Sequence, residues 1–207
     1  MEKVAVKLQI HKWELWELLY NKEFEISCHT VLDPRYNHDK LLKQHEDSFT
    51  PAVIVRGISF GRIISIFRTI SENRSGKFSY SVSEYEDLKD AGFENEVDYI
   101  SGKPLVYIVL VEDSPLTDVK TIYELSKGNI NMTTLHEQLI FDLMYYYETN
   151  QYPQDVVACG GSRDRNGNVP YRYWKNDVLY IKSMDPDVYV SGVHPYQAIR
   201  FDYCIKR

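Results

Sequence analysis

The C-terminal third of the chain constrains the fold most, because two turn signals alternate there with strand-like runs. In order, it contains the turn signal Asn166-Gly167, the run 169–174, the turn signal Lys175-Asn176-Asp177 and the run 178–181. Asn-Gly between such runs is the strongest short-range hairpin signal, since both residues tolerate a positive φ. We therefore predict an antiparallel meander over residues 155–183, with a two-residue type of turn at Asn166-Gly167 and a positive φ at Gly167.

Hydrophobic periodicity predicts further strands and helices along the chain. Strand-like alternation or continuous apolar runs occupy residues 4–10, 24–32, 52–55, 78–82, 105–111 and 198–205. Helical patterns occupy residues 13–21, 41–42, 63–70, 83–92, 117–128 and 134–150. The longest apolar run, LVYIVLV at 105–111, is typical of a central strand that is buried on both faces.

Capping signals predict where two of the helices begin and end. Thr134 and Glu137 form a capping box, in which the threonine and glutamate side chains bind amides of the first helical turn. Another helix is expected to begin after Thr117 or Asp118 and to end near Gly128, because glycine commonly follows the last helical residue.

The order of these elements predicts the fold class. Strands and helices alternate over the first two thirds of the chain, and strands then follow strands. This order favours an α+β fold with a mixed sheet, packed helices and a C-terminal antiparallel meander. The 207 residues suit one domain with a sizeable core. An alternative division separates an α/β part, residues 1–130, from a helix and β-meander, residues 131–207.

Composition excludes several classes of protein. Hydrophobic residues make up 43% and charged residues 26% of the chain, which is typical of a globular protein. No apolar run approaches the roughly 20 residues of a membrane span, and charges interrupt the N-terminal apolar stretch, so we expect neither a membrane protein nor a secretory signal. The cysteines Cys28, Cys159 and Cys204 form no C-x-x-C pair, which favours a reducing cytoplasm. Zinc spacings and glycine-rich phosphate loops are missing, so we expect no metal and no cofactor.

The heptad from Cys159 to Arg165 is the motif with the most catalytic potential. It satisfies C-x5-R and in this respect resembles the loop of phosphotyrosine phosphatases, in which a cysteine of lowered pKa attacks a phosphate held by backbone amides and an arginine. Ala158 and Asn166 depart from that pattern, and the Asn-Gly turn leaves no helix to hold the anion. Two interpretations stay open: a buried thiol before an exposed basic turn, or a nucleophile that acts with Arg163 and Arg165 on an anionic substrate.

Basic and aromatic residues of the meander form the best candidate binding surface. They are Arg163, Arg165, Tyr171, Arg172, Tyr173 and Trp174. On a strand, Tyr171 and Tyr173 share one face, and Arg172 and Trp174 share the other. Arg, Tyr and Trp dominate the energetic hot spots of protein interfaces, and the chain contains 17 tyrosines. The competing interpretation places Trp174 in the core and the turn arginines in solvent.

These features lead to a first hypothesis of non-enzymatic protein binding in the cytoplasm. The net charge of -6 disfavours general affinity for nucleic acid, and acidic stretches lie at 84–87 and 94–98. We expect an accessory protein, such as an inhibitor or anti-defence protein of a phage or mobile element, that occupies a nucleic-acid-handling partner protein. The alternative is a small cysteine-dependent hydrolase or transferase that uses Cys159 with Arg163 and Arg165. A third hypothesis is single-strand binding by residues 163–174.

Replacing Gly167 by valine is expected to destabilise the fold by about 1–2 kcal/mol, because a β-branched side chain is strained at positive φ.

Replacing Arg163 and Arg165 together by alanine is expected to change the free energy of unfolding by less than about 0.5 kcal/mol, as for exposed charges, and to weaken partner binding. Thermal melting and partner pull-down measure the two effects. If the arginine pair melts the protein and Gly167→Val does not, the arginines are buried structural groups.

Overall fold

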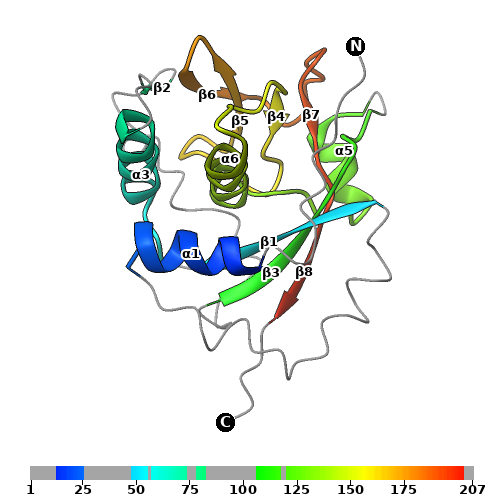
Figure 1. Ribbon diagram of the computed structural model, residues 1–207. Coiled ribbons are helices and arrows are strands. Elements are labelled where there is room, and N and C mark those ends of the chain that lie inside the picture. The colour runs from blue at the N-terminus through cyan, green and yellow to red at the C-terminus, as the bar shows by residue number, and fades with distance from the viewer. Residues whose placement is uncertain are drawn as a thin grey trace.

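The computed structural model describes residues 13–25, 48–55, 57–73, 78–82, 106–117 and 120–202. The elements that we expect at 4–10, 41–42 and 83–92 lie outside these residues, as does the strand expected at 24–32 apart from residues 24 and 25, which are not in a strand. The described helices are α1 (Trp13–Glu23), α3 (Phe60–Asn73), α5 (Ile122–Lys127) and α6 (Leu135–Thr149). Together with two sheets they form an α+β fold, which confirms the predicted fold class (Figure 1).

Sheet A is antiparallel and contains the longest apolar run of the sequence. Its strands are ordered β1 (Phe49–Val55), β3 (Val106–Glu112) and β8 (Ala198–Asp202). Residues 107–111 of β3 are all buried, so the prediction of a central strand buried on both faces is confirmed. Since β8 comes from the end of the chain and β3 from its middle, the last described strand returns to the sheet of the first half.

Sheet B is mixed. Its order is β2 (Ser79–Val82), β6 (Val178–Met184), β5 (Val169–Lys175), β4 (Val157–Ala158) and β7 (His194–Pro195). The β4–β5–β6 part is antiparallel, as the predicted meander requires, whereas β2 and β7 pair in parallel at the two edges. Asn176 and Asp177 join β5 to β6 with φ values of 51° and 61°, the two positive angles of a tight hairpin turn.

The expected two-residue turn at Asn166-Gly167 is wrong in one respect. Gly167 has the predicted positive φ, 84°, but the turn lies inside a longer loop, since β4 and β5 already pair at Ala158 and Tyr171. The buried carboxylate of Asp164 organises this loop by accepting hydrogen bonds from the amides of Asn166 (2.8 Å) and Asn168 (2.9 Å). The turn therefore arises from hydrogen bonds between Asp164 and its own loop, and not from the pairing of two strands.

The capping boxes of α5 and α6 lie where a threonine is followed three residues later by a glutamate. Thr134 and Glu137 cap α6 as predicted, and α6 ends at Asn150 with a left-handed φ of 57°. The start predicted for α5 is wrong, because Thr121 with Glu124 forms its capping box, whereas Thr117 has no acid at the required spacing.

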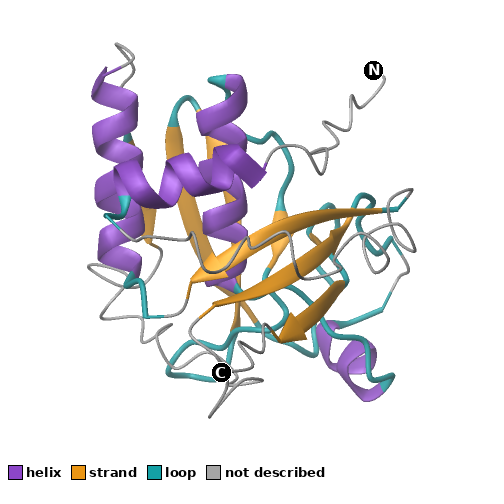
Figure 2. Cartoon of the chain, turned by 60° about the horizontal axis from the view of Figure 1, so that its bottom comes forward, coloured by secondary structure: helices purple, strands orange, loops and turns teal. Residues whose placement is uncertain are grey.

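Apolar helix faces build the main core against the two sheets. Ile63, Ile66, Phe67 and Ile70 are buried on α3, as their spacing predicts. Trp174 of β5 contacts Phe67 and is hydrogen-bonded to α6, so α3 and α6 cover the same face of sheet B (Figure 2). On the sheet A side, the hydroxyl of Tyr20 in α1 donates to the carbonyl of Val53 in β1 (2.6 Å).

Glu137 ties α6 to sheet A through a buried ion pair. Its carboxylate accepts two short bonds from Arg200 of β8 (2.6 and 2.7 Å) and one from the Tyr107 hydroxyl of β3 (2.8 Å). It also caps the amide of Thr134. Burial alone would raise the pKa of Glu137, but the Arg200 guanidinium outweighs it and holds that pKa below its usual value.

Replacing Glu137 by glutamine is expected to lower the free energy of unfolding by about 3–5 kcal/mol, because the Arg200 guanidinium is left buried without a counter-charge. The matched control is Glu124→Gln, which removes the same box residue from α5 but has no buried arginine. We expect that control to cost about 1 kcal/mol or less. Denaturant unfolding of the wild type and both variants measures the difference, and equal effects would contradict a tertiary role for Glu137.

The same pair makes stability depend on pH. Because the folded-state pKa of Glu137 lies below its usual 4.5, its contribution is complete above pH 4.5 and is lost as the pH falls through the folded-state value. The difference in unfolding free energy between wild type and Glu137→Gln should therefore shrink on acidification below pH 4.5.

Candidate functional site

Strand β5 and helix α6 bring a buried polar network together on the inner face of sheet B. Alternation along β5 turns Arg172 and Trp174 toward α6, where both bind the carboxylate of Asp142 (2.8 and 2.9 Å). Arg172 also donates to the carboxylate (3.0 Å) and the carbonyl (2.8 Å) of Asp155. Asp155 in turn accepts from the hydroxyl of Tyr196 (2.9 Å). Arg172 is thus fully buried and held by two carboxylates.

Burial and charge move the pKa values of this network in opposite directions. Burial raises the pKa of Asp142 to about 6 against the attraction of Arg172, and Asp155 adds to the rise. Burial also acts against the charged forms of Asp155 and Arg172. The attraction of Arg172 outweighs it at Asp155 and lowers that pKa, and the attraction of Asp142 and Asp155 outweighs it at Arg172 and raises that pKa. The guanidinium therefore stays charged, and Asp142 is the first member to take a proton as the pH falls.

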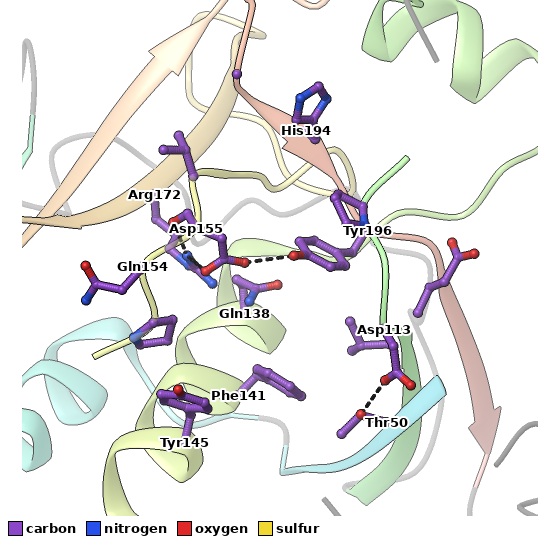
Figure 3. A pocket seen from close by; sticks show the side chains of 16 residues that line it. Thr50, Asp113, Gln138, Phe141, Tyr145, Gln154, Asp155, Arg172, His194 and Tyr196 are labelled. Carbon is purple, nitrogen blue, oxygen red and sulfur yellow. Dashed lines mark hydrogen bonds and ion pairs between the residues drawn. The ribbon is translucent and has the colours of Figure 1, made fainter. Parts of the chain in front are cut away.

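A pocket of about 610 Å³ opens beside this network, within the size range of small-molecule sites. Figure 3 shows Asp155 and Tyr196 on one side of it and Thr50 and Asp113 on another, with Phe141 of α6 below. Its walls thus combine residues from both sheets and from α6. Aromatic and apolar side chains line much of it; they include Val111, Pro115, Phe141, Tyr145, Pro153 and Val156.

Three acceptor atoms around the pocket are buried without a hydrogen-bond partner. They are Glu112 Oε2, Asp113 Oδ2 and Gln138 Oε1. Asp113 keeps its other oxygen on the Thr50 hydroxyl. Burial raises the pKa of Glu112, and the neighbouring Asp113 carboxylate adds to the rise. On the donor side, Arg172 Nε also has no partner. Buried polar atoms are usually paired, so this group of unpaired acceptors is unusual.

The outer face of β5 and β6 carries a row of tyrosines. Tyr171 and Tyr173 stack with ring centroids 6.4 Å apart, and Tyr173 stacks on Tyr180 of β6 at 4.9 Å with planes within 8°. Lys182 lies over the Tyr173 ring, 5.7 Å from its centroid. We call Tyr171, Tyr173, Tyr180 and Lys182 the tyrosine face. All four side chains are partly accessible to solvent.

The six residues that we expect to form one binding surface lie in three different environments. Tyr171 and Tyr173 belong to the tyrosine face, and Arg165 is exposed in the loop. Arg172 and Trp174 are 1% and 6% exposed and face α6, so they do not contribute to the outer surface. Arg163 is half-buried and donates to the carbonyls of its own loop.

Arg163 is bonded more firmly than an exposed charge. Its Nη1 donates to the carbonyls of Gly160 (2.8 Å) and Ser162 (2.7 Å), and burial lowers its pKa. Its replacement by alanine leaves these carbonyls without their donor, which costs about 1–3 kcal/mol. We therefore expect the replacement of Arg163 and Arg165 by alanine to lower the free energy of unfolding by more than the sequence suggested.

Cys159 and its neighbours support the start of α6. Cys159 is 0% exposed and does not line the pocket. A Cβ on Gly161 would lie 2.7 Å from the carbonyl oxygen of Met132, so glycine is required for the close approach of this loop. The Ser162 hydroxyl accepts from the amide of Leu135, the first residue of α6 (2.9 Å). A thiol in this place meets no substrate unless the loop opens, which favours the structural interpretation of the motif.

The residues that line the pocket come from distant parts of the sequence. Glu112 ends β3, Asp113 follows it, Gln138 lies on α6, and Asp155 precedes β4. Sequence inspection missed them because no motif links them. The one available signal was the acidic pair Glu112-Asp113 directly after the longest apolar run.

Comparison with family models, with curated proteins and with solved structures gives no match to this chain. No helix in the described part is long and apolar enough to cross a bilayer. The described residues also contain no cluster of three or more His, Cys, Asp or Glu side chains that could hold a metal ion.

Cys159 is expected to react slowly with iodoacetamide in the native protein and rapidly after denaturation, because a buried thiol is not accessible. The experiment uses a Cys28→Ser/Cys204→Ser variant, so that Cys159 is the single reporter. Mass spectrometry of the alkylated protein measures the rate. Rapid native labelling below about pH 8 would instead indicate an accessible thiol of lowered pKa and would favour the cysteine-dependent enzyme.

Proposed function

We propose that this protein is a non-enzymatic binding protein that docks on a partner protein through the tyrosine face of sheet B. The observation that carries the proposal is the stacking of Tyr171, Tyr173 and Tyr180 on the face of sheet B away from α3 and α6, where Tyr171 also packs against a cluster that includes Ile122 and Leu125 of α5. Tyrosine offers a large, rigid contact area with a polar tip, and it is enriched in interface hot spots. Rings that already stack on one another lose little conformational entropy on binding.

The chemistry of the face favours a protein over single-stranded nucleic acid. The rings of Tyr173 and Tyr180 lie 4.9 Å apart and nearly parallel, which leaves no gap for a base between them. Lys175 and Lys182 are the cations of β5 and β6 on this side, in a chain whose net charge is -6. We therefore infer a partner surface that offers hydrogen-bond acceptors to the tyrosine hydroxyls and the lysine ammonium groups.

We further propose that the partner is a nucleic-acid-handling protein and that binding inhibits it, as an anti-defence protein of a phage or mobile element does. Two features of the sequence support this: the net charge of -6 and the acidic stretches at 84–87 and 94–98, which could compete for a nucleic-acid site on a basic partner. Both stretches lie outside the described residues.

Replacing Tyr173 and Tyr180 together by alanine is expected to reduce recovery of the partner at least about tenfold, the loss that corresponds to an interface hot spot. Tyr123→Ala and Tyr189→Ala are matched controls, because these side chains are 45% and 38% exposed and lie outside the tyrosine face. Quantitative pull-down from extract of the native host measures recovery, and thermal melting checks that all variants are folded.

Equal recovery by the wild type and the folded double variant would contradict docking through this face. A labelled oligonucleotide is expected to show no shift at low salt. If the wild type binds the oligonucleotide and the double variant does not, the tyrosine face binds single-stranded nucleic acid and the proposal of a protein partner is wrong.

A further inference from the structure

The geometry points to a second binding site, independent of the tyrosine face: the pocket between sheet A, α6 and sheet B binds a small organic cation. The ligand class that we propose combines an apolar or aromatic body with an ammonium, amidinium or guanidinium group. This site lies on the opposite side of β5 from the tyrosine face, so it goes beyond the proposed function and does not depend on it.

In this proposal, the carboxylates of Glu112 and Asp113, at and just after the end of β3, bind the cationic group of the ligand. Glu112 and Asp113 both line the pocket, and among the described residues neither forms an ion pair. The Thr50 hydroxyl holds one oxygen of Asp113, which leaves its Oδ2 and Glu112 Oε2 buried without a donor. An N–H-bearing cation supplies both the missing donors and the missing charge.

Gln138 is an independent observation that points to a ligand with donor groups. Its side chain is 2% exposed, lies on α6 and lines the same pocket (Figure 3). Its amide nitrogen faces the Asp142 carboxylate (3.4 Å), which only accepts hydrogen bonds when ionised. The amide oxygen is therefore the atom left buried without a partner, and in this proposal it accepts from the ligand.

The rest of the pocket fits an apolar body. Phe141 and Tyr145 lie one turn apart on α6, Pro115 follows β3, and Pro153 lies between α6 and β4. Aromatic rings beside carboxylates form a common setting for organic cations, because the ring face also attracts positive charge. A volume of about 610 Å³ accepts a ligand larger than a single functional group.

The charges around the pocket disfavour the other ligand classes. Arg172 lines it, but Asp142 and Asp155 already neutralise this guanidinium, so an anion meets the Glu112 and Asp113 carboxylates without a free counter-charge. Hard metal ions take six or more oxygen ligands, and the described residues contain no acidic cluster of the size that a metal ion needs.

Three probes of nearly equal shape test the charge of the ligand: benzamidine, which is cationic, benzamide, which is neutral, and benzoate, which is anionic. Isothermal titration and the ligand-induced shift in melting temperature are measured on the full chain. We expect benzamidine to bind at least about tenfold more tightly than benzamide, the effect of one charge-assisted contact, and benzoate to bind least. Equal binding of the three probes, tightest binding of benzoate, or no binding of benzamidine at millimolar concentration overturns the proposal.

The variant Glu112→Gln/Asp113→Asn locates the site. It keeps the size of both side chains and removes their charge, so benzamidine affinity should fall at least about tenfold, to the level of benzamide. The matched control is Asp187→Asn, an exposed acid outside the pocket, which should bind benzamidine like the wild type. Unchanged affinity in the double variant, or equal loss in the control, overturns the assignment to this pocket. Partner recovery is expected to be unchanged in the double variant, so the two proposals fail separately.

Discussion

Two buried carboxylates on α6 hold the two sheets of this protein together. Glu137 binds Arg200 of sheet A, and Asp142 binds Arg172 of sheet B, so the first turn of α6 is tied to one sheet and its middle to the other, each by an arginine from a distant part of the chain. A buried ion pair is weak evidence for net stability, since desolvation of both charges opposes their attraction. Its value here lies in specificity: removal of either partner leaves a buried charge, so alternative packings of α6 are penalised. Figure 1 shows α6 in the middle of the molecule, where both sheets reach it.

The pocket follows from this arrangement. Helix α6 binds one sheet through Glu137 and the other through Asp142, and two of the residues between these points line the pocket. Gln138 and Phe141 occupy that interval and line the pocket, which the end of β3 closes from the sheet A side. Asp155 and Tyr196 complete it on the sheet B side and also fix Arg172. Gln138, whose amide oxygen has no partner, thus lies one helical turn from Asp142, which ties α6 to sheet B.

Strand β5 contributes side chains to two different surfaces. Its even-numbered residues Arg172 and Trp174 enter the network on α6, whereas Tyr171 and Tyr173 stack outside. A change at Arg172 is therefore expected to act through stability and the pocket, and a change at Tyr173 through the outer face. Cys159, Gly161 and Ser162 serve a third purpose, the close packing of a loop on the N-terminal end of α6.

The sequence by itself determined the features that arise from contacts between near neighbours. The capping box of Thr134 and Glu137, the left-handed turns at Gly167 and Asn176-Asp177, and the burial of residues 107–111 on both faces of β3 all follow from local backbone and solvation preferences. Tertiary structure alone decided which face of β5 meets α6, because alternation separates Arg172 from Tyr173 without stating which side is inside. It also decided that Glu112, Asp113 and Gln138 share a pocket. Such residues meet only when the sheets and α6 pack, and the energy of their charges depends on the burial that this packing creates.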